Sequence, residues 1–475
     1  MSKLSVRFVS LGCSKNLVDS EVMMGSLQEH DFEIVSPDEA SDVGVINTCG
    51  FIDAAKKESI DTIMELALEK KAGRLKLLVV AGCLSQRYAE ELPKLIPEVD
   101  AFIGTGDFAK LSEVIQQKLK GSKERNFIRK PTMELPSKEL PRVHTTPFYY
   151  RYLKVSEGCS HSCSFCTIPL MRGGLQSRGV ADILSEMKMG VNEGVKEFNL
   201  IAQDLNEYGR DLKDRDSLYN LLKQMGNIDG NFWVRLLYMY PLQFPDKLIK
   251  LIKDHPHIIP YVDIPLQHIN DAILKSMKRG SSSKYIYRLL EMLQKEIPEI
   301  VLRTTFILGY PGEGDKEFGQ LLKFIREIQF DRLGVFTFSY EEGTPSSLLP
   351  NQVPQTLKEE RQKILMEVQQ GISAKKHKKL IGKTFDVIYE SPIAVEEKDM
   401  FPGATGVGRY FGQAPEIDGE TFIKFKKGAM PEVGSLIKVK ITDAKEYDLV
   451  GESLETVKKP TPIERKISPS LPFNV

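Results

Sequence analysis

Residues 150–166 read YRYLKVSEGCSHSCSFC, a strand-like run followed at once by three closely spaced cysteines. Cys159, Cys163 and Cys166, called here the loop cysteine set, have the spacing C-x3-C-x2-C, so their thiolates can converge on one metal centre. Soft sulfur ligands select zinc, copper(I) or an iron–sulfur cluster. Zinc would need a fourth ligand, for which His161 is a candidate, whereas a 4Fe–4S cluster on three cysteines keeps one iron open. The spacing favours the cluster over zinc or simple loop cysteines.

The segment 148–374 around this motif alternates strand and helix signals. Six apolar runs are each followed by a helical pattern, which is typical of a parallel sheet covered by helices. Six such units predict a partial (β/α)6 barrel with its active site at the C-terminal ends of the strands, where the cysteine loop lies. The predicted strands are Tyr150–Val155, Glu197–Ala202, Trp233–Leu237, Tyr261–Ile264, Val301–Ile307 and Leu333–Phe338.

Residues 1–125 alternate in the same way and predict an open parallel sheet covered on both faces. Cys13, Cys49 and Cys83, the N-terminal cysteine set, each follow a predicted strand by two or three residues. Ligands of open parallel sheets bind beyond the carboxyl ends of the strands, so the three should meet at one edge. A lone cysteine is often a small core residue, but three equivalent ones favour a second 4Fe–4S site with an open iron. The predicted strands are Val6–Leu11, Val43–Ile46 and Leu77–Ala81, and the predicted helices Ser20–His30, Ile52–Lys71 and 85–93.

Three further segments differ in composition. Residues 126–147 carry four prolines among charges and are expected to be a linker. Residues 376–457 contain short β-rich runs between Gly, Pro and Asp turns, which predict a small antiparallel barrel of about five strands. Residues 458–475 are proline-rich and are expected to form an extended tail. The predicted barrel strands are Thr384–Tyr389, Thr421–Phe425, Leu436–Ile441 and Leu449–Leu454.

The composition is that of an ordinary globular protein, with 475 residues, 41% hydrophobic and 27% charged. Sixty-five Lys and Arg balance 65 Asp and Glu, which argues against coating nucleic acid through bulk charge. No apolar segment approaches the roughly 18 residues that span a membrane, and the N-terminus lacks a signal-type region. A cytoplasmic location without membrane partners is therefore expected, where six cysteines would not form disulfides.

The loop cysteine motif, with the aromatic Phe165 before its last cysteine, resembles the radical S-adenosylmethionine superfamily. That superfamily implies a partial (β/α)6 barrel. The sequence motifs around the N-terminal cysteine set resemble those of the methylthiotransferases. These motifs are GCSKNLVDSE from Gly12, NTC from Asn47 and AGC from Ala81. The resemblance covers nearly the whole chain, and the small C-terminal barrel resembles an OB-like TRAM domain. GCSKNLVDSE is nearer to members that modify a ribosomal protein than to tRNA-modifying members, which more often carry a Gln-Met-Asn variant.

This resemblance implies two 4Fe–4S clusters, S-adenosylmethionine and an electron donor such as flavodoxin or ferredoxin. One S-adenosylmethionine would methylate sulfur held at the N-terminal cysteine set. A second would be cleaved at the loop cysteine set to give a radical that removes a hydrogen from the substrate. It also implies cofactor-binding roles for Phe165, Gln203, Gln267 and Arg303, the arginine through a methionine carboxylate. Internal ion pairs, such as Arg235 with Asp263, are the alternative for charges on the barrel strands.

The implied substrate is an aspartate in the twelfth protein of the small ribosomal subunit, methylthiolated at its β-carbon to 3-methylthioaspartate. Residues 376–457 hold 12 Lys and Arg against 14 Asp and Glu, a net charge of −2 that suits a basic ribosomal protein better than tRNA. Glu416, Asp418 and Glu420 are therefore predicted to contact the substrate. Two alternatives stay open: a tRNA adenosine 2-methylthiotransferase, which the basic run 375–379 would suit, and a non-enzymatic iron–sulfur RNA-binding protein.

Overall fold

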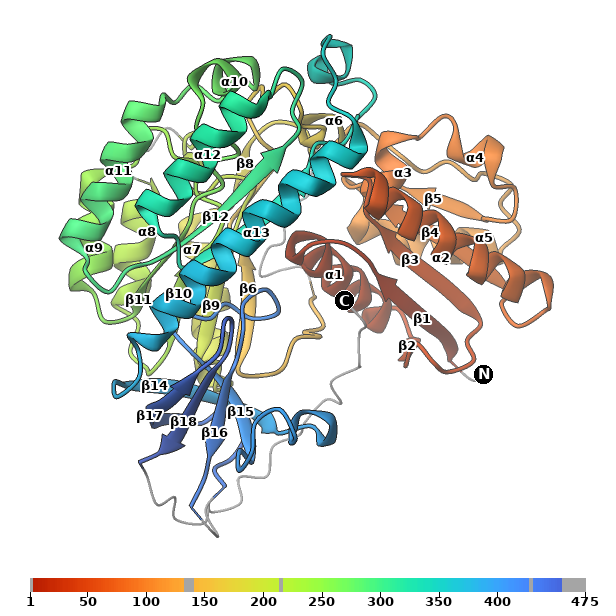
Figure 1. The fold of residues 1–475 in the computed structure, drawn as a ribbon. Coiled ribbons are helices and arrows are strands. Elements are labelled where there is room, and N and C mark those ends of the chain that lie inside the picture. The colour runs from red at the N-terminus through yellow and green to blue at the C-terminus, as the bar shows by residue number, and fades with distance from the viewer. Residues whose placement is uncertain (1–2, 132–140, 213–216, 427–429, 455–475) are drawn as a thin grey trace.

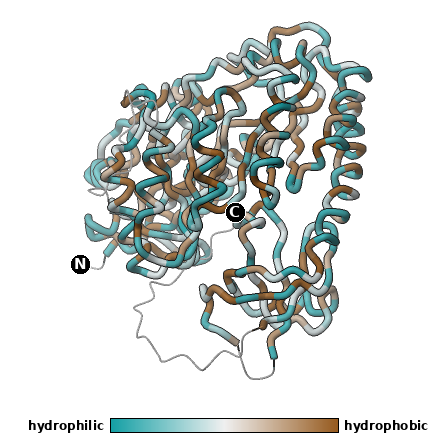
Figure 2. The backbone as a smooth tube through the Cα atoms, turned by 90° about the vertical axis from the view of Figure 1, so that its left-hand side faces the viewer, coloured by the Kyte–Doolittle hydropathy of each residue, from teal (hydrophilic) through white to brown (hydrophobic). Residues whose placement is uncertain are grey.

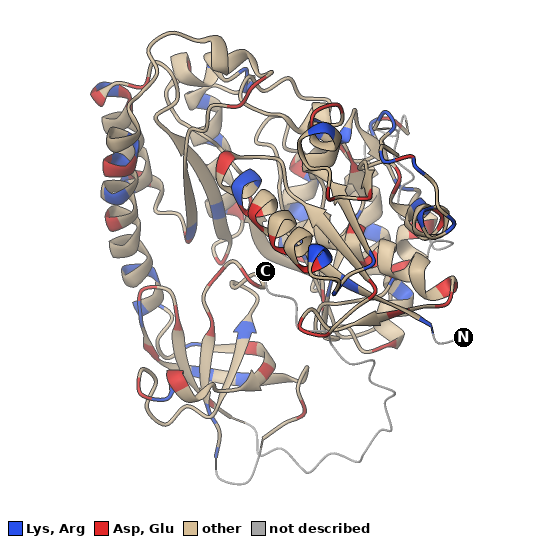
Figure 3. Ribbon diagram, turned by 90° about the vertical axis from the view of Figure 1, so that its right-hand side faces the viewer, with Lys and Arg blue, Asp and Glu red and all other residues tan. Residues whose placement is uncertain are grey.

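The computed structural model describes residues 3–131, 141–212, 217–426 and 430–454. It consists of an N-terminal sheet, a larger central sheet backed by helices, and a small C-terminal barrel below the central sheet (Figure 1). Apolar and polar residues alternate along the backbone (Figure 2), and charges of both signs lie mainly on the helices and loops (Figure 3). Among the described residues, no helix has the length and apolarity that a membrane crossing requires.

The N-terminal sheet has the order β2-β1-β3-β4-β5, and every neighbouring pair is parallel. Alternate side chains enter two separate apolar clusters, because successive residues of a strand point to opposite faces. The short strands β2 and β5 were not predicted. The strands are β1 (Leu4–Ser10), β2 (Phe32–Val35), β3 (Val43–Thr48), β4 (Leu77–Gly82) and β5 (Ala101–Ile103). The helices are α1 (Ser14–Glu29), α2 (Asp53–Lys71), α3 (Cys83–Arg87), α4 (Leu92–Leu95), η1 (Phe108–Lys110) and α5 (Leu111–Leu119).

Two helices of this part differ from their predicted bounds. Helix α1 begins at Ser14, well before the predicted Ser20. Its first turns carry polar residues such as Lys15 and Asp19, which are buried, so a pattern of apolar residues could not reveal them. The predicted helix 85–93 is split into α3 and α4. Pro93 has no N–H and therefore suits the first turn of a new helix better than the interior of a long one.

The central sheet has the order β13-β12-β11-β10-β9-β6 with all neighbours parallel, so the prediction of a partial six-stranded barrel is confirmed. One face packs under the helices in the largest apolar cluster, and the inner face carries aromatic and charged side chains. The strands are β6 (Tyr150–Lys154), β9 (Glu197–Ile201), β10 (Trp233–Leu236), β11 (Ile258–Asp263), β12 (Val301–Leu308) and β13 (Arg332–Thr337).

Helices follow the strands of the central sheet, as the alternating pattern predicted. The α-helices are α6 (Ile168–Arg172), α7 (Val180–Asn192), α8 (Ser217–Gly226), α9 (Asp246–Asp254), α10 (Asp271–Ser276), α11 (Ser283–Glu296), α12 (Asp315–Ile328) and α13 (Gln355–Lys378). The short elements are the pair β7 (Ser156–Glu157) and β8 (Gln176–Ser177), with η2 (Leu205–Glu207) and η3 (Pro345–Leu348).

The C-terminal barrel is closed in the order β14-β15-β16-β18-β17. It is not wholly antiparallel as predicted, because β16 and β18 pair in parallel. Strand β15 escaped prediction, since its sequence GVGRY has two glycines, which weaken a strand pattern. The strands are β14 (Thr384–Pro392), β15 (Gly406–Tyr410), β16 (Thr421–Lys424), β17 (Leu436–Ala444) and β18 (Leu449–Ser453), with η4 (Val395–Glu397). The expected tail 458–475, and residues 132–140 of the expected linker, lie outside the described residues.

The loop after β15, residues 411–420 and called here the floor, closes the lower end of the central sheet's inner face. Arg235 of β10 is fully buried, and its Nε donates to the Glu197 carboxylate of β9 at 2.6 Å. The same guanidinium donates to the backbone carbonyls of Phe411 and Gln413 at 2.7 and 3.1 Å. Arg409 of β15 also reaches Glu197, at 2.8 Å. Burial alone would raise the pKa of Glu197, but the two guanidiniums lower it, so the group stays ionised.

Arg235→Met should lower the free energy of unfolding by about 3–5 kcal/mol, because the buried Glu197 and two carbonyls would lose a donor. Arg210→Met is the control: Arg210 is 70% exposed and pairs with Glu207 on the surface, a contact worth about 0–1 kcal/mol. Chemical denaturation followed by circular dichroism measures both. Equal stability of Arg235→Met and the wild type would contradict the role assigned to this floor.

Candidate active site between the N-terminal and central sheets

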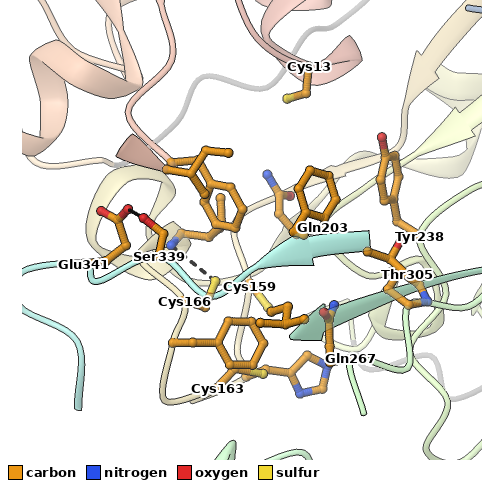
Figure 4. A pocket seen from close by; sticks show the side chains of 18 of the residues that line it. Cys13, Cys159, Cys163, Cys166, Gln203, Tyr238, Gln267, Thr305, Ser339 and Glu341 are labelled. Atoms are coloured by element: carbon orange, nitrogen blue, oxygen red, sulfur yellow. Dashed lines mark hydrogen bonds between the residues drawn. The ribbon is translucent and has the colours of Figure 1, made fainter. Parts of the chain in front are cut away.

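A cavity of about 420 Å³ lies where the C-terminal ends of the central strands face the cysteine edge of the N-terminal sheet. All six cysteines line it, and Figure 4 shows Cys13 across the cavity from the loop cysteine set. The N-terminal cysteine set follows β1, β3 and β4, and the loop cysteine set follows β7. Strand ends thus bring each set together, whereas the meeting of both sets in one cavity depends on how the two sheets are placed.

Two glycines explain how the N-terminal cysteines approach each other. Gly12 has φ +93°, and a Cβ there would lie 2.8 Å from the Cβ of Cys49. Gly82 has φ +101°, and a Cβ would lie 2.3 Å from Oδ1 of Asn47 and 2.6 Å from the Thr48 carbonyl oxygen. Only glycine tolerates both the left-handed backbone and such crowding. Each Gly-Cys pair therefore lets one cysteine pass close to the neighbouring strand end.

The buried thiols are protonated when no metal binds them. Burial is the largest cause that raises the pKa of Cys49 to about 12, of Cys159 to about 11 and of Cys166 to about 12. Burial also raises the pKa of Cys83, against the opposing effect of Arg172. A metal centre ligated by thiolates must displace these protons and supply positive charge in their place.

The spacing of the sulfurs suits a cluster better than a single ion. Among the described side chains, the only three potential ligands within 4.8 Å of one another are His161, Asp204 and Glu207, so neither cysteine set is that compact. Zn–S bonds of about 2.3 Å would place the sulfurs of a zinc site about 3.8 Å apart. His161 already has partners, since its Nε2 lies 2.7 Å from Oδ2 of Asp204 and its ring stacks on Tyr240.

A group of four buried charges, the charge quartet, joins the two sheets beside the cavity. Arg172 of α6 donates to Asp19 of α1 at 2.7 Å and to Glu157 at 2.9 Å. Lys154 of β6 donates to the same two carboxylates. Burial alone would raise the pKa of Glu157, but Arg172 and Lys154 lower it to about 2. The quartet is therefore two ion pairs with no net charge. Its members are Asp19, Lys154, Glu157 and Arg172.

The charge quartet also contacts the N-terminal cysteine set and the cavity wall. Arg172 Nε donates to the Sγ of Cys83 at 3.3 Å, and the same guanidinium donates to Oδ1 of Asn16 at 3.0 Å. Gln203 Nε2 donates to Glu157 at 2.6 Å, and its Oε1 is buried without a partner among the described residues. The quartet thus positions a cysteine of the N-terminal set and an amide in the cavity wall at the same time.

Three of the four residues expected to bind cofactor line the cavity: Phe165, Gln203 and Gln267. Like Gln203, Gln267 has a buried Oε1 without a partner in the described structure. The backbone angle φ of Gln267 is +71°, which is unusual for a residue other than glycine, and Tyr238 in the same wall has φ +65°. Strained backbone of this sort gathers at functional sites. Two unpaired amide oxygens and two strained residues fit a ligand that donates hydrogen bonds here.

Arg303 is absent from the described lining of the cavity, so its cofactor contact stays a prediction. Its NH1 donates to Oδ1 of Asp263 at 3.1 Å, and its Nε lies 3.9 Å from Asp418 of the C-terminal barrel. These contacts form an internal ion pair of the kind expected as the alternative, but Asp263 pairs with Arg303, and Arg235 pairs with Glu197. The direction in which the Arg303 side chain leaves β12 decides which partner it meets, and the sequence of the strand does not reveal that direction.

Arg279, which no sequence pattern indicated as a site residue, lines the cavity instead. Its guanidinium lies 4.0 Å from the centre of the Tyr240 ring, and NH1 lies 3.7 Å from the Sγ of Cys163. Its Nε is buried without a partner among the described residues. Arg279 follows helix α10 in a turn without any recognised motif, so only the fold brings it to the loop cysteines.

The acidic loop of the C-terminal barrel is largely engaged within the protein. The Glu416 carboxylate accepts hydrogen bonds from the hydroxyls of Tyr150 at 2.6 Å and Tyr152 at 3.0 Å. Asp418 accepts one from Tyr261 at 2.7 Å, and its side chain is only 3% exposed. Asp418 therefore belongs to the floor under the central sheet, which corrects its expected contact with a substrate. Glu416 is exposed despite its two hydrogen bonds, so a substrate contact by Glu416 stays a prediction.

Glu420 is half-buried, at the C-terminal end of the floor. Burial is the main cause that raises its pKa to about 7, and Glu390, Glu397 and Asp448 add to the effect. Near neutral pH this carboxyl therefore carries only part of a negative charge. A substrate-contacting role for Glu420 stays a prediction, with weaker charge attraction than the sequence suggested.

Three family models match the chain: the uncharacterized protein family UPF0004 over residues 5–104, the radical SAM superfamily over 153–325 and the TRAM domain over 381–454. Among solved structures, the radical S-adenosylmethionine methyltransferase TsrM from Kitasatospora setae aligns with a TM-score of 0.55 at 15% identity, covering 73% of this chain and 77% of that one. The cobalamin-dependent enzyme OxsB gives 0.51 at 14%, covering 77% and 56%. Identities this low show likeness of fold alone.

Curated relatives resemble the chain over almost its full length. The ribosomal protein uS12 methylthiotransferase RimO of Geobacter sulfurreducens is 45% identical, over 95% of this chain and 99% of the relative. The protein of that name from Geotalea uraniireducens is 46% identical, over 95% and 98%. The chain therefore belongs to the RimO family of methylthiotransferases within the radical SAM superfamily.

Proposed function

We propose that this chain methylthiolates the β-carbon of an aspartate in ribosomal protein uS12 to give 3-methylthioaspartate. The observation that carries the proposal is that both cysteine sets line one cavity, in a chain whose near-full-length relatives are named ribosomal protein uS12 methylthiotransferases. Membership of the radical SAM superfamily implies a 4Fe–4S cluster and S-adenosylmethionine. The loop cysteine set holds that cluster in this proposal, and the N-terminal cysteine set holds a second one.

When bound, these groups supply a carbon-centred radical that removes an unactivated hydrogen and a methylated sulfur that replaces it. The chain positions and shields them. Gln203 and Gln267 offer unpaired amide oxygens to the amino group of the methionine moiety, and Arg279 offers its guanidinium to the carboxylate. Apolar side chains such as Ile168 and Met239 line the same cavity and keep water from the reacting atoms.

The proposed activity is tested with anaerobically reconstituted protein, S-adenosylmethionine, a flavodoxin or ferredoxin reducing system and purified uS12. Peptide mass mapping should find one aspartate carrying a methylthio group. tRNA containing isopentenyl-adenosine should stay unmodified under the same conditions. Methylthio-adenosine in the tRNA, with uS12 unchanged, would assign the chain to the tRNA-modifying class. Absence of any S-adenosylmethionine cleavage would favour a non-enzymatic protein.

Replacing Cys159, Cys163 and Cys166 together with Ala should leave about half of the wild-type iron, because three cysteines hold each cluster in this proposal. Formation of 5′-deoxyadenosine should be lost. Iron and sulfide analysis and chromatography of the reaction products measure the two effects. A full iron content in this variant would show that the loop cysteine set holds no cluster.

Replacing Cys13, Cys49 and Cys83 together with Ala should also leave about half of the iron but should spare reductive cleavage of S-adenosylmethionine. Sulfur transfer to uS12 should disappear, because its site would be gone while the loop cysteine set is intact. Parallel assays of 5′-deoxyadenosine and of modified uS12 separate the two steps. If methylthiolated uS12 still formed, the N-terminal cysteine set would have no part in sulfur transfer.

A further inference from the structure

We infer that Lys15 binds the carboxylate of the substrate side chain and so selects an aspartate over its uncharged analogue. The inference deepens the proposed function and rests on it. It concerns a residue that precedes the predicted start of α1 and to which the sequence analysis assigned no role. Its basis is the balance of charges in the cavity wall and the position of the Lys15 ammonium within it.

The cavity wall contains one basic side chain whose charge is already neutralised and one that belongs to the loop cysteines. Arg172 pairs with Asp19 and Glu157 within the charge quartet. Arg279 lies against Cys163 and Tyr240, on the side of the loop cysteine set. Neither is therefore free to meet a second anion near the N-terminal cysteine set.

Lys15 is different, because it is buried without a counter-ion. It is 7% exposed and lines the cavity. In the described part of the chain, no carboxylate or hydrogen-bond acceptor pairs with its Nζ, which lies 3.3 Å from the centre of the Tyr238 ring. The acidic residue of the cavity wall, Glu341, is already paired with Lys56 at 2.8 Å and Arg87 at 2.6 Å. A buried cation without an anion is unfavourable, so the site is complete only when a ligand brings a negative charge.

The position of Lys15 fits the carboxylate of an aspartate in particular. Lys15 is in the first turn of α1, two residues after Cys13, where the N-terminal end of a helix also favours an anion. Tyr238 supports the ammonium, and its own backbone N–H donates to Oδ2 of Asp263 at 3.2 Å. In aspartate the β-carbon is bonded directly to the carboxylate carbon. Holding the carboxylate at Lys15 therefore places the β-carbon beside the N-terminal cysteine set.

The decisive experiment compares peptide binding by Lys15→Met and by the wild type. The ligands are a uS12 peptide that contains the target aspartate in its unmodified form and the same peptide with asparagine at that position. Met keeps most of the Lys stem and removes the charge. Cluster-loaded Lys15→Met should bind the aspartate peptide about tenfold or more weakly than the wild type, whereas its affinity for the asparagine peptide should change little. Titration calorimetry measures the dissociation constants, and iron analysis shows that the variant retains its clusters.

Two further variants sharpen the test. Lys15→Arg keeps the charge and should recover part of the preference for aspartate. Lys57→Met removes a lysine from the exposed face of α2 and should bind both peptides as the wild type does, which excludes an effect of overall charge. In turnover, Lys15→Met should raise KM for the aspartate peptide more than it lowers kcat.

Equal losses for the two peptides, or an unchanged preference for aspartate in Lys15→Met, would overturn the inference while leaving the proposed function standing. A wild-type protein that binds and modifies neither uS12 nor its aspartate peptide would overturn both. We expect the wild-type protein to modify the aspartate peptide. We also expect the Lys15→Met variant to bind the aspartate and asparagine peptides with similar affinity.

Discussion

Two positive and two negative side chains are enclosed between the N-terminal and central sheets, and they tie the sheet edge that carries Cys83 to the central part of the chain. Removing one member of such a buried group leaves an unpaired charge, which typically costs about 3–5 kcal/mol. The charge quartet spans the junction, with Asp19 on α1 and the other three members from the central part. Because Arg172 also contacts Cys83 and Glu157 also contacts Gln203, the group that holds the sheets together also orders the cavity wall.

A second set of ion pairs acts at another edge of the cavity. Glu341 accepts from Lys56 of α2 and from Arg87 of α3, so a residue beyond β13 is tied to two helices of the N-terminal sheet. Charged contacts are directional and tolerate fewer alternative arrangements than apolar ones. Anchors at two edges therefore limit rotation of one sheet against the other, which keeps the two cysteine sets facing the same space.

Sequence patterns predicted the parts of this site that depend on strand ends. The Gly-Cys pairs after β1 and β4, and the cysteine loop beyond β6, each follow an apolar run and so mark the end of a strand. These patterns predicted both parallel sheets and the edges that meet at the cavity. Lys15, Arg279 and the floor loop could not be found in this way. Their environment is set by residues far away in the chain, and a buried charged residue in a sequence looks the same as an exposed one. Arg303 shows the converse: a position on a predicted strand did not tell which charge its side chain would meet.

The floor beneath the central sheet has a consequence for the order in which the chain can finish folding during synthesis. Arg235 leaves the ribosome long before its acceptor Phe411, which lies 176 residues further on. Until residues 411–413 emerge, the Arg235 guanidinium can pair with Glu197 but lacks its two backbone carbonyl acceptors. The lower end of the sheet then stays open to water. Translation must therefore approach its end before the central sheet closes. A prematurely terminated product would leave the lower end of the central sheet exposed to solvent, where quality-control proteases can recognise it.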